Sequence, residues 1–115
     1  MNWENKNNER LIKAFMSLNS AGETQAFLRD LMTEDEIKEF ANRLKTAQML
    51  ADKIPYSSIV KETGLSSTTI ARVSKWLNGP LGGYKTILNK LHRHNHSSRE
   101  EIGRTNSNSS RNDFT

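Results

Sequence analysis

The stretch from Pro55 to Asn78, PYSSIVKETGLSSTTIARVSKWLN, constrains the fold of this chain more than any other. It predicts two short helices joined by a tight turn. Pro55 suits a first helical turn, where its missing N–H would have no partner anyway. Gly64 is placed to end the first helix, because glycine readily adopts a positive φ. Ser66 or Ser67 can then cap the second helix by accepting a hydrogen bond from its open N–H groups.

The second helix of this stretch has two distinct faces. Ile70, Val73 and Leu77 recur at helical spacing and form one apolar stripe. The opposite face carries short hydroxyl groups, a methyl group and two cations, from Ser67, Thr68, Ala71, Arg72 and Lys75. Such a face, held across a glycine turn, is typical of a helix-turn-helix that reads the major groove. The alternative is an ordinary corner between two helices with a solvated face. The apolar stripe, the glycine, the turn and the serine cap together favour a DNA-binding helix-turn-helix over it.

The charge of the chain is concentrated in the same segment. The net charge is +4, yet residues 1–52 carry seven Lys/Arg against nine Asp/Glu. Residues 53–91 carry six cations against Glu62 alone, and residues 92–115 carry four against three. A basic segment that coincides with a helix-turn-helix pattern indicates a nucleic-acid partner.

Four further helices are expected around this segment. Residues 4–19 and 23–32 form the first two, separated by a break at Ser20-Ala21-Gly22. Thr33 and Glu36 form a capping box at the start of a long helix that runs to about residue 53. Its apolar positions, expected to form the core, are Ile37, Phe40, Ala41, Leu44, Ala47 and Ala51. After Gly79-Pro80 and the joint Gly82-Gly83, a last amphipathic helix covers about residues 83–92.

Composition sets the domain organisation. We expect one small helical domain over residues 1–92 and a polar, disordered tail over residues 93–115, because the tail is almost devoid of apolar residues. Since only 34% of the chain is hydrophobic, burial between subunits is expected to complete the core. The chain has no cysteine, no signal-peptide pattern and no apolar run able to span a bilayer, so we expect a cytoplasmic protein.

Two segments carry a family resemblance: LMTEDEIKEFANRLKTAQML and IPYSSIVKETGLSSTTIARVSKWLNGPLGGYKTIL. Together they resemble the Trp repressor family, and within it the Trp-repressor-like branch called YerC/YecD. The resemblance covers roughly residues 9–91. It implies an all-α, intertwined homodimer whose N-terminal helices interlock and whose helix-turn-helix units protrude as two DNA-reading heads. A two-fold dimer of this kind would read a palindromic site with half-sites about one helical turn apart.

The resemblance also implies an effector pocket, in which the repressor binds tryptophan. Thr33, Arg43 and Arg72 match the family's threonine, its indole-stacking arginine and its carboxylate-binding arginine. Two positions depart from the pattern, with Val73 in place of a glycine and Trp76 in place of a serine. Trp76 either fills the space that tryptophan takes in the repressor or packs against the last helix. We therefore expect no tryptophan dependence and no cofactor; Arg43 and Arg72 also fit salt-bridge and phosphate contacts.

Residue chemistry suggests how the reading head would contact DNA. Ser67, Thr68 and Ala71 are candidates for base edges, with Ser57 as a weaker one. The candidates for phosphate contacts are Lys61, Ser66, Thr69, Arg72 and Lys75. His92, His94 and His96 alternate near the C-terminus, but without a fixed scaffold we expect no metal site.

Two classes of function remain after the sequence is taken as a whole. The first is a homodimeric, sequence-specific transcriptional regulator of double-stranded DNA, most simply a repressor, with no membrane partner and an effector yet to be identified. The second is a helical interaction or architectural module that binds DNA weakly. No paired carboxylates, nucleophile–base pair or cofactor loop stands out, so an enzyme is not expected.

Overall fold

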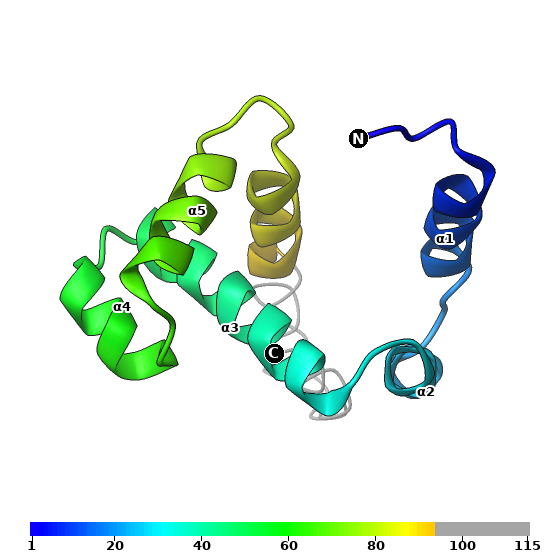
Figure 1. Ribbon diagram of the computed structural model, residues 1–115, viewed down its shortest axis with the longest axis horizontal. Helices are drawn as coiled ribbons and strands as arrows, with labels where there is room; N and C mark the ends of the chain where they lie inside the picture. The colour runs from blue at the N-terminus through cyan, green and yellow to red at the C-terminus, as the bar shows by residue number, and fades with distance from the viewer. Residues whose placement is uncertain (94–115) are drawn as a thin grey trace, which may run out of the picture.

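The computed structural model describes residues 1–93, which form six helices and no strand. In chain order they are α1 (Lys6–Met16), α2 (Ala21–Leu31), α3 (Glu34–Ala51), α4 (Tyr56–Thr63), α5 (Ser67–Leu77) and a final helix over residues 83–93 (Figure 1). The predicted all-α class is confirmed. Residue 93, assigned to the tail from sequence, is still helical, and the rest of the predicted tail lies outside the described residues. No described helix is long and apolar enough to cross a membrane.

The first two helices differ from their predicted bounds because side-chain caps set their ends. Asn5 caps α1 by accepting from the N–H groups of the residues two and three positions on, so the helix starts later than residue 4. Ser20 does not break the chain but caps α2, accepting from the Glu23 N–H at 3.1 Å. Ala21 and Gly22, predicted as part of the break, are therefore the first residues of α2.

The long helix α3 begins as the sequence predicts and ends two residues early. The Thr33 hydroxyl accepts from the Glu36 N–H, and the Glu36 carboxylate accepts from the Thr33 N–H, which completes the capping box. At the other end, Asp52 is the C-cap and Lys53 takes a left-handed conformation with φ of 65°. The left-handed residue turns the chain out of the helix.

The helix-turn-helix is present, with its signals in the predicted order. Pro55 is the N-cap of α4 rather than its first helical residue, so the ring precedes the first turn and displaces no hydrogen bond. Gly64 ends α4 with φ of 73°, a conformation that glycine adopts without a Cβ clash. Of the two candidate caps for α5, the structure uses Ser66, whose hydroxyl accepts from the Thr69 N–H.

The core lies where α3, α5 and the final helix meet. Its buried residues are Ala47, Val73, Leu77 and Leu88, with Leu44, Leu50 and Tyr84 packed against them. Ile59 in α4 and Ile70 in α5 are fully buried as well. The apolar stripe predicted for α5 is therefore confirmed. The stripe predicted for α3 is only partly buried, since Phe40 is 43% exposed.

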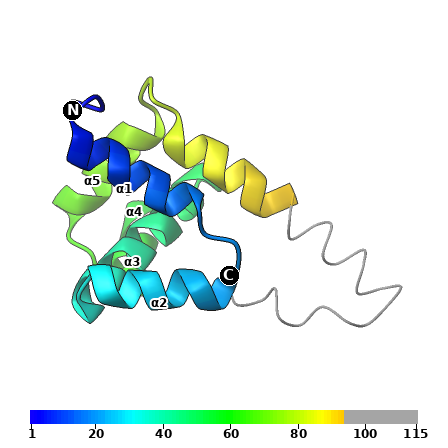
Figure 2. The same ribbon diagram turned by 90° about the vertical axis from the view of Figure 1, so that its right-hand side faces the viewer.

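The helices α1 and α2 form an arm that stands away from the rest of the fold (Figure 1). We call these two helices the N-terminal arm. Within residues 1–93 the substantial packing among the labelled helices joins α3, α4 and α5 to one another, and the arm takes no part in it. Neither α1 nor α2 contains a buried residue. In Figure 2 the two helices of the arm run in roughly opposite directions, and α2 leads into the start of α3. Apolar side chains of the arm such as Leu11, Ile12 and Met16 therefore remain exposed in the described part of the chain.

Candidate nucleic-acid interface

The reading head, α4 and α5 with the turn between them, presents the predicted polar face to solvent. All three base-edge candidates on α5, Ser67, Thr68 and Ala71, are exposed in its first two turns. Their exposure follows from the burial of Ile70 and Val73, which orients the opposite side of the helix outward. Because the side chains on this face are short, α5 can approach base edges closely.

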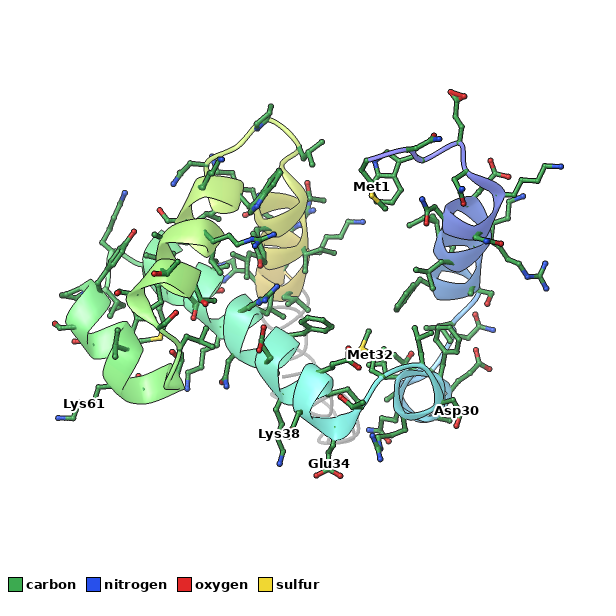
Figure 3. All side chains as sticks on the ribbon, in the orientation of Figure 1. Met1, Asp30, Met32, Glu34, Lys38 and Lys61 are labelled. Atoms are coloured by element: carbon green, nitrogen blue, oxygen red, sulfur yellow. The ribbon has the colours of Figure 1, made fainter. Side chains whose placement is uncertain are left out.

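The cations and hydroxyl groups assigned to phosphates do not all have the same surroundings. Lys61, Ser66, Arg72 and Lys75 are exposed, as is Ser57, the weaker base-edge candidate, and Figure 3 shows Lys61 projecting outward from α4. Thr69 is half-buried instead, and its hydroxyl accepts from that of Ser66 at 3.0 Å. Their mutual bond makes Ser66 and Thr69 part of the cap of α5, so we expect the exposed cations to supply the main phosphate contacts.

One ion pair fixes the reading head to α3 and was not anticipated from the sequence. Lys45 in α3 lies 2.9 Å from Glu62 in α4, nitrogen to oxygen. Glu62 is the only acidic residue in residues 53–91, so its charge is balanced by a residue from another helix. Both side chains are about half exposed, and an exposed pair contributes at most about 1 kcal/mol.

A small cavity lies between α3 and α5 at the position of the predicted effector pocket. It has a volume of about 30 Å³ and is lined by Arg43, Thr69, Arg72, Val73, Trp76 and Tyr84. Four of the five predicted pocket residues therefore come together. We call this space the arginine cavity. Its volume suits one or two water molecules, whereas pockets for small-molecule ligands measure about 300–1,000 Å³.

Arg43 is already engaged on its own helix. Its guanidinium pairs with the Glu39 carboxylate one turn earlier and lies 5.5 Å from the centre of the Phe40 ring, within cation–π range. Its Nε atom is buried without a hydrogen-bond partner. The salt bridge anticipated for Arg43 is therefore present.

Thr33, the fifth predicted pocket residue, lies away from the other four within the chain. It caps α3 ten positions before Arg43, which corresponds to about 15 Å along the helix axis. Its hydroxyl is used in the capping box. The single chain therefore does not bring Thr33 into the arginine cavity.

The two residues that depart from the family pattern both border the arginine cavity. Val73 is 3% exposed and belongs to the core. Trp76 is 45% exposed and also lines an apolar groove with Leu81 from the preceding turn and with Tyr84 and Ile87 from the final helix. Trp76 thus takes part in both arrangements considered from sequence, bordering the cavity and facing the final helix. Tyr84 was missed as a cavity residue, because only the turn at residues 79–82 carries it back to α5.

The histidines give no metal site in the part of the chain that the structure describes. His92 is exposed on the final helix, and His94 and His96 lie outside the described residues. Within residues 1–93, no group of three or more His, Cys, Asp or Glu side chains is placed to hold a metal ion.

Comparison with known proteins places this geometry in a family. The sequence model of the Trp repressor protein family matches residues 6–92, which include α1 to α5 and all but the last residue of the final helix. The chain belongs to the Trp repressor family. It is 36% identical over 83 residues to the uncharacterized protein YerC of Bacillus subtilis, covering 72% of this chain and 80% of YerC. It also matches the crystal structure of a TrpR-like protein from Eubacterium eligens with a TM-score of 0.74 and 32% identity, covering 78% and 93% of the two chains.

Membership of the Trp repressor family confirms the YerC-like resemblance and the all-α, Trp-repressor-like fold expected from sequence. It also places the chain among DNA-binding proteins of transcription regulation that use a helix-turn-helix. The family is regulatory rather than enzymatic.

Proposed function

We propose that this protein is a homodimeric, sequence-specific regulator of transcription, most simply a repressor, whose DNA binding does not depend on tryptophan. The observation that carries the proposal is the two-sided character of α5. Its apolar stripe is buried against α3 and the final helix, while its hydroxyl, methyl and guanidinium groups are exposed along one face. A helix supported in this way can enter the major groove without losing its packing.

The unpartnered N-terminal arm supports the homodimer. The rings of Phe15 and Phe27 pack edge-to-face with their centroids 5.5 Å apart, yet the Phe15 side chain stays 38% exposed. An apolar groove of about 540 Å³ on the arm is lined by Trp3, Ile12 and Met16 among others. Leu11, Ile12, Met16 and Leu31 of the arm are exposed as well, and a cluster of exposed apolar side chains is typical of a protein–protein interface. A second copy would cover the arm in an isologous interface and would set two reading heads one helical turn apart on DNA, about 34–36 Å.

The size of the arginine cavity supports independence from tryptophan. Val73 and Trp76 occupy positions where the family pattern has smaller residues, and the space left between Arg43 and Arg72 is about 30 Å³. An indole ring with an amino-acid backbone needs roughly ten times that volume of pocket. Binding would therefore require Trp76 to leave its place.

Selection of bound sequences from a random pool of double-stranded DNA, with and without L-tryptophan, tests the proposal. We expect one palindromic motif in both conditions, bound at least about a thousandfold more tightly than bulk DNA. A motif that appears only with tryptophan would contradict the independence from tryptophan. Enrichment of no motif would contradict the regulator and favour the interaction module.

Arg72 and Thr68 are expected to differ in how they contribute to DNA binding. Arg72→Ala should weaken binding to all sequences and reduce the slope of log affinity against log salt by about one, because a phosphate contact is lost. Thr68→Ala should change the selected motif at one position per half-site. Fluorescence anisotropy over a salt series measures the affinity and slope of Arg72→Ala, and selection from the random DNA pool gives the motif of Thr68→Ala. Lys90→Ala, which removes one charge on the final helix, is the control; an Arg72→Ala affinity equal to that of Lys90→Ala would contradict the docking.

Restoring the two small residues of the family pattern should open the arginine cavity. We expect Val73→Gly combined with Trp76→Ser to bind L-tryptophan at least about tenfold more tightly than the unchanged chain, since the indole side chain bordering the cavity is removed. The glycine lowers helix propensity by about 1 kcal/mol, and the loss of the buried Val73 side chain costs about 2–3 kcal/mol more, so circular dichroism first checks that the double variant is folded. Isothermal titration measures the affinity, and Trp3→Ser is the control. Micromolar tryptophan binding by the unchanged chain would show that the cavity is not blocked.

A further inference from the structure

A cavity much larger than the arginine cavity lies at the C-terminal end of α5. The base-edge candidates lie at the N-terminal end of the same helix. The cavity has a volume of about 540 Å³ and is formed where α3 ends, α5 ends and the final helix passes, the three helices that lie together in Figure 1. We call it the lysine cavity. The first lining residue on α5, Ser74, lies seven positions after Ser67, which corresponds to about 10 Å along the helix axis. A space of this volume is in the range of small-molecule sites.

The lining of the lysine cavity is divided into an apolar floor and a cationic rim. Leu77 and Leu88, 5% and 8% exposed, supply the floor together with the half-buried Leu50. Lys53 and Lys85 supply the charge, and no carboxylate is among the described residues that line the cavity. Apolar walls with a few converging polar groups are typical of sites that bind an amphipathic molecule.

The nearby acceptors that would compete for the lysine ammonium groups already have donors. The carbonyl oxygens of Gln48, Met49 and Leu50, at the end of α3, accept from backbone N–H groups of the following turn. The Ser74 carbonyl, at the end of α5, accepts from both the backbone N–H and the side-chain amide of Asn78.

The nearest acidic residue in sequence is also engaged elsewhere. The Asp52 carboxylate accepts from the Gln48 side-chain amide, with oxygen–nitrogen distances of 3.1 and 3.2 Å, and Asp52 does not line the cavity. The rim therefore offers hydrogen-bond donors and positive charge, and few acceptor groups of the protein compete for the lysine ammonium groups.

We propose that the lysine cavity binds a small organic monocarboxylate with an apolar body, its carboxylate between Lys53 and Lys85 and its body on Leu77 and Leu88. Charge-assisted hydrogen bonds to the ammonium groups fix the carboxylate, and burial of the body against the floor supplies most of the affinity. Because the cavity joins three helices, an occupant ties the end of α5 to α3 and to the final helix. The site does not depend on DNA binding.

Sodium octanoate is the probe, with octanamide as a neutral molecule of the same shape. In a ¹H–¹⁵N NMR titration of the full chain, we expect saturable shifts at Ser74, Asn78 and Asn89, and an affinity at least about tenfold higher for octanoate than for octanamide. Octanoate should also raise the melting temperature, because a ligand that binds only the folded state stabilises it. Equal affinities, no saturation, or shifts confined to the grooves of Trp3 or Leu81 would overturn the proposal.

Two variants of the final helix test the role of the charge. Lys85→Glu, and the milder Lys85→Gln, should lower the octanoate affinity by at least about tenfold and abolish the rise in melting temperature. Lys90→Glu makes the same charge change one turn further on, outside the cavity lining, and should alter the affinity by less than about twofold. An equal loss in Lys85→Glu and Lys90→Glu would show non-specific attraction and overturn the proposal. Circular dichroism of each variant confirms that it is folded.

Discussion

Ile70→Ala is expected to destabilise the protein by about 3 kcal/mol and to lower its melting temperature by roughly 10–20 °C. Ile70 is fully buried in α5, and its loss leaves a cavity beneath the reading face. The whole stability of a small domain is about 5–15 kcal/mol, so the effect is a large share of it. Since α4 packs on α5, the reading head should lose its shape before the rest of the fold does. Thermal denaturation followed by circular dichroism, at a fixed protein concentration, measures the change.

Val60→Ala is the matched control for Ile70→Ala. Val60 lies in α4, one residue after the fully buried Ile59, but its own side chain is 39% exposed. Its truncation should therefore cost less than about 1 kcal/mol. Similar melting temperatures for the two variants would contradict the assignment of Ile70 to the core of the reading head.

Phe15→Glu is expected to convert the protein from dimer to monomer, weakening self-association by at least about a hundredfold. Phe15 is the exposed member of the aromatic pair on the N-terminal arm, and a carboxylate there would have to be buried in the proposed interface. Sedimentation velocity over a concentration series measures the association. Operator affinity should fall together with the dimer fraction, because a monomer contacts one half-site only.

Gln25→Glu introduces the same charge on an exposed position of α2 and should leave the dimer intact. A Phe15→Glu protein that remains dimeric would show that the arm is not the interface. An unchanged chain that sediments as a monomer would contradict the homodimer itself.

The local signals in the sequence predicted the reading head closely. Gly64 and Ser66 act within a few residues of their own position, one through its backbone freedom and the other through a hydrogen bond to the Thr69 N–H. The capping box of Thr33 and Glu36 is local in the same way. Such features depend on neighbouring residues, so the sequence places Gly64 and the capping box and narrows the cap of α5 to Ser66 or Ser67.

The structure differs from the sequence-based expectation at three points, the start of α2, the end of α3 and the burial of the apolar residues of α3. Serine and glycine disfavour helix interiors, so Ser20-Ala21-Gly22 predicts a break in the chain of helices. The same serine is also a strong N-cap, and α2 starts directly after it. The end of α3 was placed at residue 53, whereas Lys53 adopts a left-handed conformation that a lysine sequence pattern does not reveal. The apolar residues of α3 were read as core although Phe40 remains exposed in the chain.

The sequence by itself determined the helical class, the helix-turn-helix and the polar face of α5, because helix periodicity and caps are encoded over a few residues. Only the tertiary structure decided what lies between the helices. It brought Arg43, Arg72, Trp76 and Tyr84 around a cavity of about 30 Å³ and left Thr33 outside it. It also opened the larger cavity beside Lys53 and Lys85. Cavities depend on how residues distant in the chain pack against one another, and packing is a property of the whole fold.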